Sequence, residues 1–350
     1  ERIFPHLAEG FIADIWRKEG KDANLPQERL DQVFHGTLTL LYRLLFLFYA
    51  ESRDLLPAKE VRGYYDVSIK KLKTDIAEKA GDIEDESFSK ISKHYQADEF
   101  EIYNRLARLF QVIDKGDEKL NVPIYNGGLF ITDVDQADDS AEAVNARFLC
   151  EWAVPDRYFA QAIDLMARDV DDKRQDLVFI DYKSLGVRQL GSMYEGLLEF
   201  RLRLAPEKMA IVKGKKTEEV ITYKEAISKK RNILKTGKGK TATEPIIPKG
   251  SVYLENDKRE RKATGSYYTP QHIVNYIAEH TVGPVLKEKL EYLRPKLREV
   301  EQRRRAFDKK QEALKKGGLL PEPEEKKLRI GMELVDEVFN IRVLDPAMGS

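Results

Sequence analysis

Two short segments of the chain combine small, hydroxylated and acidic residues in patterns that suit a small ligand. The first spans residues 262–270 and reads Lys-Ala-Thr-Gly-Ser-Tyr-Tyr-Thr-Pro. Thr269 is expected to cap a helix whose first residue is Pro270, because proline lacks the N–H that would be unpaired there. This helix is predicted to run from Gln271 to about Thr281. Its buried face is predicted to consist of Ile273, Val274, Ile277 and Ala278. A helix N-terminus suits a carboxylate ligand, and a capped helix without any ligand is the alternative.

The second segment spans residues 341–350 and reads Ile-Arg-Val-Leu-Asp-Pro-Ala-Met-Gly-Ser. An apolar strand that ends in an acidic residue and a turn of small residues is how open α/β sheets present a nucleotide-like ligand. Asp345 would orient an amine or a hydroxyl group of the ligand. The small residues after it would let the ligand approach the backbone closely. A plain strand-to-helix turn is the alternative interpretation of the same residues.

Taken together, the two segments resemble motifs X and I of the gamma-ordered DNA adenine methyltransferases, in their restriction–modification and type I modification-subunit branches. Three earlier stretches resemble the helical region that precedes motif X in the long single-chain, type IIG members. These stretches are Phe48–Arg53, Tyr125–Phe130 and Leu190–Glu199. The resemblance covers roughly residues 35–350, with gaps. It implies that the chain is the front portion of such an enzyme.

The resemblance implies S-adenosyl-L-methionine as the cofactor. In relatives the motif X loop contacts the methionine end of the cofactor, and the matching residues here are Ser266, Tyr267, Tyr268, Thr269 and Pro270. Motif I of relatives holds the same moiety with its acidic residue and small turn. Here the matching residues are Asp345, Pro346, Ala347 and Gly349. Thr269 is the single position that the comparison of motifs favours most.

The reaction implied by the resemblance is methyl transfer from S-adenosylmethionine to the exocyclic amino group of adenine in duplex DNA. In this motif order the catalytic Asn-Pro-Pro-Tyr loop follows motif I, and no Asn-Pro-Pro-aromatic sequence occurs in the 350 residues. The catalytic residues are therefore unknown. The target-recognition domain would lie further on as well. We expect the chain by itself to be inactive, and a nuclease domain to be possible elsewhere in the parent protein.

The predicted fold class is a mostly α-helical N-terminal region followed by the start of an α/β Rossmann-like methyltransferase domain. Residues 1–250 are interpreted as a helical connector and residues 251–350 as the opening of the methyltransferase domain. Helices are expected at Leu38–Tyr49, Asn104–Ile113, Phe159–Met166 and Leu190–Leu202. Residues 79–86 are expected to form a loop, and Leu177–Ile180 a short strand or the start of a buried helix. Residues 126–128, Asn-Gly-Gly, predict a tight turn that uses positive φ.

The charge of the chain is balanced overall and uneven along the sequence. Lys plus Arg and Asp plus Glu both number 60. Residues 1–160 hold 21 basic and 30 acidic side chains, and the remainder holds 39 and 30. Two segments are strongly basic: residues 213–240 form a predicted surface hairpin or loop, and residues 286–316 a projecting helix or helical hairpin. They predict contacts with DNA phosphates, and ordinary solvated surface is the alternative.

Cysteine, histidine and apolar runs limit the other function classes. The single cysteine, Cys150, excludes a disulfide framework and a cysteine-based metal site, and predicts a reducing, cytoplasmic compartment. The longest apolar run, Leu38–Tyr49, is short for a membrane helix and is interpreted as a buried helix. The five histidines lack the spacing of metal ligands, so no metal site is predicted; they are His6, His35, His94, His272 and His280.

Two rival interpretations stay open at the level of sequence. Asp169, Asp171 or Asp172, followed by the strand and Asp-x-Lys of residues 180–183, imitates the active site of a metal-dependent nuclease. The whole chain could also be a non-catalytic helical scaffold or DNA-binding module whose basic segments grip phosphates. An Asn-Pro-Pro-Tyr sequence downstream in the parent gene would favour the methyltransferase.

Overall fold

The computed structural model divides the chain into two compact units, Glu1–Ala263 and Thr264–Ser350. The residues that the structure describes are 3–20, 25–59, 63–125, 127–134, 138–171, 176–185, 189, 191, 196–197, 200–213, 218–234, 246–256, 269, 271–313, 340 and 342.

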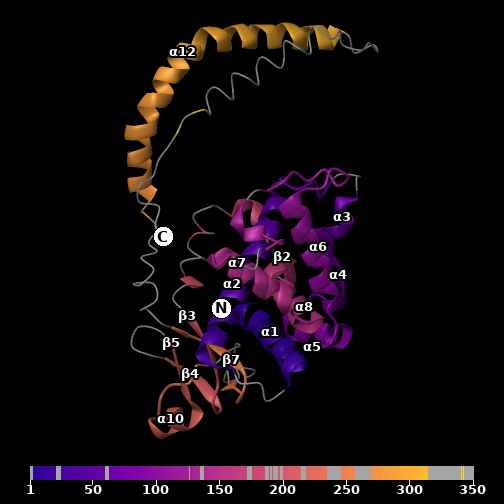
Figure 1. Cartoon of the computed structure of the whole chain (residues 1–350), viewed down its shortest axis with the longest axis vertical. Coiled ribbons are helices and arrows are strands. Elements are labelled where there is room, and N and C mark those ends of the chain that lie inside the picture. Colours follow the sequence, from indigo (N-terminus) through magenta and orange to yellow (C-terminus); the bar gives the residue numbers. More distant parts are fainter. Residues whose placement is uncertain are drawn as a thin grey trace. The chain divides into compact units, whose positions relative to one another are not determined.

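The first unit is built on a body of α-helices (Figure 1). Its helices are α1 (Ile3–Glu19), α2 (Gln27–Ser52), α3 (Tyr64–Val67), α4 (Ile69–Ala80), α5 (Glu84–His94), α6 (Glu101–Lys115), α7 (Ala141–Glu151) and α8 (Asp156–Ala167). Two short 3₁₀ helices, η1 (Gly128–Phe130) and η2 (Tyr182–Ser184), lie in its connections. Helix α2 packs against α1, α4 and α7, and α8 packs against α1, α4, α5 and α6.

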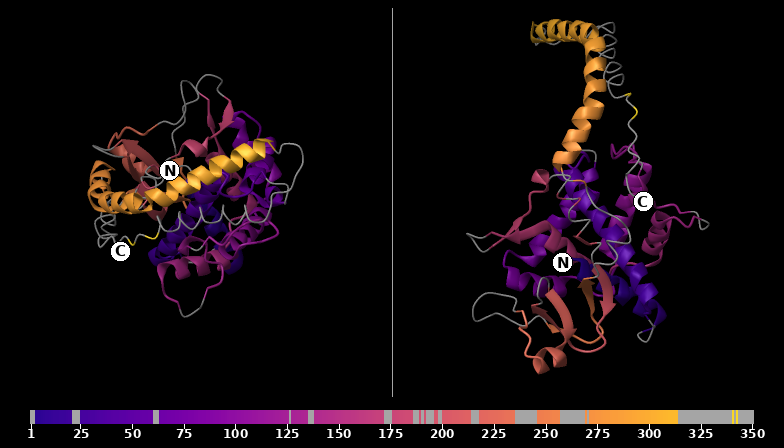
Figure 2. Two further views of the ribbon diagram at one scale, coloured as in Figure 1. Left: turned by 90° about the horizontal axis from the view of Figure 1, so that it is seen from above. Right: turned by 90° about the vertical axis from the view of Figure 1, so that its left-hand side faces the viewer.

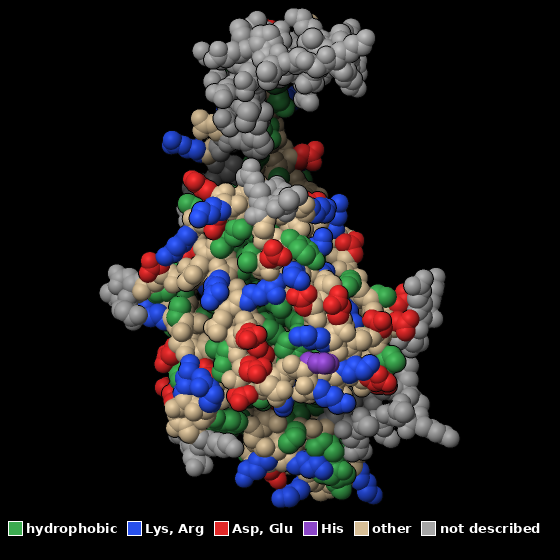
Figure 3. All heavy atoms as spheres, turned by 90° about the vertical axis from the view of Figure 1, so that its right-hand side faces the viewer, with side chains coloured by type: hydrophobic (Ala, Val, Ile, Leu, Met, Phe, Trp, Pro, Cys, Tyr) green, Lys and Arg blue, Asp and Glu red, His purple; other side chains and the backbone are tan. Residues whose placement is uncertain are grey.

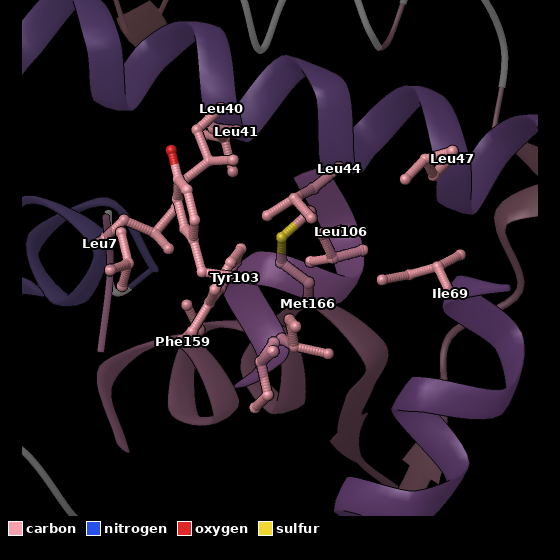
Figure 4. Packing of buried hydrophobic residues seen from close by; sticks show 14 of the residues in the cluster. Leu7, Leu40, Leu41, Leu44, Leu47, Ile69, Tyr103, Leu106, Phe159 and Met166 are labelled. Atoms are coloured by element: carbon pink, nitrogen blue, oxygen red, sulfur yellow. The ribbon is translucent and has the colours of Figure 1, made fainter. Parts of the chain in front are cut away.

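The core of the helical body forms where α2, α6 and α8 meet. Figure 4 shows Leu44 of α2 pointing toward Leu106 of α6 and Met166 of α8. All three side chains are buried. Leucines at three- and four-residue spacing give α2 one continuous apolar face, and burying such side chains contributes about 1.5–3 kcal/mol each. Gly36 lets α2 approach α7 closely, because a Cβ there would overlap the ring of Phe148.

Three of the predicted helices are confirmed in the helical body, and a predicted loop is shorter than expected. The segment Leu38–Tyr49 lies in α2, and Asn104–Ile113 and Phe159–Met166 lie in α6 and α8. The loop predicted over residues 79–86 is too long: it is confined to residues 81–83, because α4 continues to Ala80 and α5 begins at Glu84. Gly81, at φ 72°, ends α4 within a single left-handed residue. Acidic residues in the first turn of α5 favour its early start.

By length and composition alone, helix α2 is long and apolar enough to cross a membrane. It is longer than the apolar run Leu38–Tyr49, which the sequence alone marks as too short for a membrane helix. It has 26 residues, and 72% of its most apolar window is buried inside the protein. A helix of the core passes the same test of apolar length. We interpret α2 as a core helix because its leucines contact the surrounding helices.

Short antiparallel strands follow the helical body. Strand β1 (Arg168–Val170) pairs with β2 (Leu177–Phe179), so the strand alternative for Leu177–Ile180 is confirmed. Strand β3 (Phe200–Leu204) pairs with β7 (Val252–Asn256). A three-stranded sheet has the order β5-β4-β6, with β4 (Met209–Lys213), β5 (Glu218–Thr222) and β6 (Ile246–Ile247). Helix α10 (Tyr223–Ser228) follows β5.

Two predictions for this region need correction or refinement. The helix expected at Leu190–Leu202 is wrong at its end, because Phe200–Leu204 forms β3. Arg201 and Arg203 alternate with apolar residues there, and Leu202 is fully buried. Residues 213–240 are predicted to form a surface hairpin or loop; in the structure β5 of this segment pairs with β4, which ends at Lys213. That segment also contains α10, whose Ala226 packs in a small core with Ala210 and Val212.

The division between the compact units falls later than the predicted boundary at residue 250. Strand β7 begins at Val252, yet it pairs along its whole length with β3 and packs against α1. Both partners belong to the first unit. The backbone hydrogen bonds of β7 therefore place residues 252–256 with the helical body.

The second unit contains one long helix, α12 (Gln271–Ala313). The sequence predicts a helix from Gln271 and a projecting helix over residues 286–316, and the structure joins the two into a single element of 43 residues. Pro284 and Pro295 lie inside it. Proline removes a helical N–H and clashes with the preceding turn, which favours bending; α12 is bent along its length (Figure 2). The predicted strand at residues 341–344 lies outside the described residues except for Arg342.

Candidate functional site

Thr269 is the only predicted cofactor-binding residue within the described part of the chain. It is exposed and lies two residues before the first residue of α12. The other predicted positions lie outside the described residues: Ser266, Tyr267, Tyr268, Pro270, Asp345, Pro346, Ala347 and Gly349. The structure therefore describes the helix that follows the first motif, and brings no pair of the predicted residues together.

The first turns of α12 begin where the capping pattern predicts a helix, at Gln271. Their side chains make local contacts. The Thr281 hydroxyl donates to the carbonyl of Ile277 at 2.6 Å. The rings of Tyr276 and His280 stack with centroids 4.0 Å apart. His280 Nδ1 also lies 2.8 Å from the carbonyl oxygen of Tyr276. These are contacts within one helix, and they set the orientation of side chains on its surface.

The predicted burial of this helix is wrong. Ile273, Val274 and Ile277 are exposed by 40%, 41% and 51%. Ala278 is exposed as well. The spacing predicts one apolar face correctly, but a helix buries that face only where another element packs on it. The start of α12 thus presents an uncovered apolar face directly after the motif that contains Thr269.

The middle of α12 is partly covered. Leu293 is fully buried, and Leu286 and Leu297 are half-buried. Lys289 Nζ donates to the carbonyl of Asn340 at 3.0 Å. Asn340 comes shortly before the second motif, so that contact brings the approach to residues 341–350 beside the middle of α12. This hydrogen bond is the contact that the structure describes between α12 and the residue that precedes the second motif.

A basic surface covers the end of the first unit that carries β4, β5 and α10. Figure 3 shows lysine and arginine side chains gathered at this lower end of the view. The described residues between 200 and 256 include nine basic and five acidic side chains. Arg231 pairs with Glu219 at 2.6 Å, and Lys224 with Glu207 at 3.3 Å. Exposed pairs of this kind contribute little, so these cations stay available to an external phosphate.

The stretch Tyr125–Phe130 is held by an arginine of the core helix. Arg43 Nε donates to the carbonyl of Leu129 at 2.8 Å, and Nη2 donates to that of Ile131 at 3.0 Å. Its guanidinium lies 5.1 Å from the ring centroid of Phe110. Burial lowers the pKa of Arg43. The turn is packed as expected, but Gly127 is extended at φ −160°, so the predicted use of positive φ is wrong there.

The stretch Phe48–Arg53 supplies a buried carboxylate that caps another helix. Glu51 accepts hydrogen bonds from the Tyr64 hydroxyl at 3.0 Å and from the backbone N–H groups of Ile69 and Lys70 at 2.9 and 2.8 Å. These N–H groups open α4 and would otherwise be unpaired. Burial raises the pKa of Glu51, and the three hydrogen bonds oppose that rise. The role of Glu51 is structural.

A second buried carboxylate, that of Asp156, caps the start of α6. Asp156 accepts from the N–H groups of Glu101 and Ile102 at 3.1 and 2.8 Å. Its pKa is raised by burial and lowered in part by these bonds. The sequence does not predict the roles of Glu51 and Asp156, because the partners of these carboxylates lie far along the chain. Arg43 carried a visible signal, a charged residue inside an apolar helical run.

The nuclease-like pattern has structural roles in the described residues. The Asp181 carboxylate accepts from the N–H of Lys183 at 2.9 Å and so begins η2. The Tyr182 hydroxyl donates to the carbonyl of Met166 at 2.7 Å. Asp169 accepts from the N–H of the next residue. Within the described ranges no three histidine, cysteine or acidic side chains gather as metal ligands would. Asp172 lies outside those ranges.

Described residues of the first unit line a larger and a smaller cavity. The larger, about 540 Å³, lies between α1, α5, α8 and the β1–β2 hairpin. Polar side chains that line it are hydrogen-bonded to one another. Arg168 Nε donates to Asp164 at 2.8 Å, and the Ser87 hydroxyl donates to the same carboxylate at 2.7 Å. The smaller cavity, about 210 Å³, lies beside the end of α2 and the start of α4. None of the predicted cofactor-binding residues lines either cavity.

Comparison with known proteins adds no relative to these observations. No protein family model matches the chain, and it has no match among the curated proteins or the solved structures. Any functional assignment therefore rests on the motif segments and on the geometry described above.

Proposed function

We propose that the chain is the front portion of a DNA adenine methyltransferase that takes its methyl group from S-adenosylmethionine. The observation that carries the proposal is the junction at Thr269: a helix begins at Gln271, directly after a segment that resembles motif X. Its apolar face is uncovered, as the first helix of a larger α/β domain would be without the remainder of that domain. The contact of Lys289 with Asn340 adds support, because it holds the approach to the motif I segment on the same helix.

In this proposal the residues of the two motifs bind the cofactor and the described units hold it against DNA. Residues 266–270 and the turn that contains Asp345 would contact the methionine end of the cofactor. The cofactor would supply the methyl group, and residues outside this chain would hold the flipped adenine. The basic surface over β4, β5 and α10 would contact duplex phosphates without reading sequence. A restriction–modification or related defence role follows from the same resemblance.

The test of cofactor binding uses Thr269→Val in the full-length parent. Losing one hydrogen bond to a charged ligand weakens binding by about 10- to 100-fold. Calorimetric titration with S-adenosylmethionine should show that loss, whereas the affinity for duplex DNA should barely change. Thr281→Val is the matched control, because the Thr281 hydroxyl bonds to a carbonyl of its own helix. Equal cofactor affinity in wild type and Thr269→Val would contradict the assignment.

The basic surface favours a second candidate, a non-catalytic DNA-binding module. The nine basic side chains that the structure describes between residues 200 and 256 are its support. A transfer assay with labelled S-adenosylmethionine and adenine-containing duplex DNA separates the two candidates in the parent protein. The methyltransferase predicts labelled adenine from the parent and none from the 350-residue chain. DNA binding without any transfer by the parent would favour the module.

A further inference from the structure

The smaller cavity of the first unit lies where the end of α2, the start of α4 and the η2 segment meet. Its volume is about 210 Å³. Phe48 and Tyr182 form part of its wall, with rings stacked 4.9 Å apart at an interplanar angle of 21°. The Tyr182 hydroxyl is bonded to the backbone and so is held in place. The cavity therefore has a rigid aromatic side that does not depend on a ligand.

Two lysines of α4 face this cavity without an ion pair. Lys70 and Lys73 both line it and are separated by three positions, which places them on one face of the helix. Lys73 Nζ lies 4.8 Å from the ring centroid of Phe179 and 5.7 Å from that of Phe48. Among the residues that the structure describes, no carboxylate lies within ion-pair distance of either amino group. Burial lowers the pKa of Lys73, the charge of Lys70 lowers it further, and the charge of Glu51 opposes both effects.

The acidic groups of the same cavity are already engaged. Glu51 caps α4 with three accepted hydrogen bonds, and it influences Lys73 only through space. Asp181 accepts the N–H that begins η2. Lys59 at the rim pairs with Asp54 at 2.7 Å. Two positive charges on one helix face are therefore left for an external anion.

We propose that this cavity binds a phosphate group, with Lys70 and Lys73 as its cationic ligands. Lysine is a common point-charge partner of phosphate in proteins. The volume is below the roughly 300–1,000 Å³ of pockets that enclose a whole small molecule, so it suits one charged group. That group belongs to a DNA backbone or to a free phosphate compound. The inference does not rest on the proposed methyltransferase activity, because it uses contacts of the helical body alone.

The experiment measures binding of inorganic phosphate to the complete 350-residue chain by calorimetry and by changes in NMR chemical shifts. Lys73→Met removes the charge and keeps an aliphatic side chain of similar length. Lys70→Gln removes the charge at an exposed position and keeps a polar side chain. Lys93→Gln, on the exposed last turn of α5, is the matched control. Each cavity variant should bind phosphate about tenfold more weakly, and the control should bind as wild type does. Circular dichroism checks the fold, and Lys70→Gln decides the result if Lys73→Met unfolds.

A second arm distinguishes the two sources of phosphate. Duplex DNA binding is measured by fluorescence anisotropy over a range of salt concentrations. A DNA backbone phosphate predicts weaker DNA binding by both variants, with a salt slope lower by about 0.9. A free phosphate compound predicts weaker phosphate binding with unchanged DNA binding. The proposal is overturned if wild type binds no phosphate, or if both cavity variants bind it as the control does. Failure of methyl transfer in the parent would leave these results unchanged.

Discussion

Helices α2 and α12 are both long and carry a regular apolar face, yet their surroundings differ. In α2 the side chains of Leu40, Leu44 and Leu47 are all fully buried. In α12 the side chains of Tyr276 and Ile277 are exposed by 62% and 51%. The same periodicity thus predicts a helix in both places and burial in only one. Burial is decided by the elements that pack on the face, and these are a property of the whole fold.

The two helices also differ in how their polar groups are satisfied. The Glu51 carboxylate, near the end of α2, accepts hydrogen bonds from Tyr64 of α3 and from the first N–H groups of α4. Removing this carboxylate therefore affects three helices. The polar contacts at the start of α12 join residues four positions apart in one helix. Long-range contacts make unfolding cooperative, whereas local ones leave each turn to open by itself. We expect the first unit to have a stability of its own and α12 to depend on further polypeptide.

Amide hydrogen exchange should show the largest difference between the two helices. Core amides of α2 open only with the whole unit, and a stability of about 5 kcal/mol or more slows their exchange by roughly 10³-fold or more. Amides of residues 271–281 should exchange close to the unprotected rate in this chain, since an isolated helix is marginal in water. Strong protection of residues 271–281 in the monomeric chain would contradict the comparison. In the full-length parent these amides should become protected.

Removing the Glu51 carboxylate should destabilise the first unit and leave α12 unchanged. Glu51→Ala leaves the N–H groups of Ile69 and Lys70 without their acceptor, which costs about 2–4 kcal/mol. Denaturant unfolding monitored by tryptophan fluorescence measures this loss, because both tryptophans, Trp16 and Trp152, belong to the first unit. Glu86→Ala is the control, since that carboxylate is exposed and its ion pair with Lys90 lies on the surface. A loss no larger than that of the control would show that water replaces the cap.

The sequence predicts local helices well because their signal is periodic and local. The leucines of α2 and the apolar spacing of α6 suffice for both elements. Strand β3 was missed because its alternation covers five residues beside a helical pattern. The caps by Glu51 and Asp156 could not be predicted, since a carboxylate and the N–H groups it caps are brought together only by tertiary packing. Of the candidate site, the start of α12 after Thr269 was predictable, and the exposure of its apolar face was not.

The pH dependence of unfolding should carry the signature of the buried carboxylates. Burial raises the folded-state pKa of Glu51 and Asp156 above 4.5 and 3.8, so the folded state binds protons more tightly than the unfolded chain does. Their contribution to stability is therefore fully present below these values and is lost as pH rises through the folded pKa. Glu51→Gln should flatten the fall in unfolding free energy above about pH 4.5.

Urea unfolding from pH 4 to 8 tests that sign. Glu86→Gln is the control with the opposite direction, because pairing with Lys90 lowers the pKa of that exposed carboxylate. The wild type and Glu86→Gln should lose stability with rising pH more steeply than Glu51→Gln. Parallel curves for Glu51→Gln and wild type would mean that the hydrogen bonds to Glu51 cancel its burial.

The smallest expected effect concerns which of the two units contacts DNA phosphates. Neutralising Lys229, Lys230 and Arg231 together tests the basic surface of the first unit, and neutralising Lys287, Arg294 and Lys296 tests α12. Each lost phosphate contact lowers the slope of log affinity against log salt by about 0.9, so a triple variant lowers it by at most about 2.7. We expect the first-unit variant to show the change in this chain, because its side chains are held on a folded sheet and helix. The α12 variant should show it only in the parent, where the helix has a partner and its charges are held in one orientation. Slopes unchanged in both variants would mean that these lysines and arginines are solvated surface, and the DNA contacts would then have to lie in other parts of the parent.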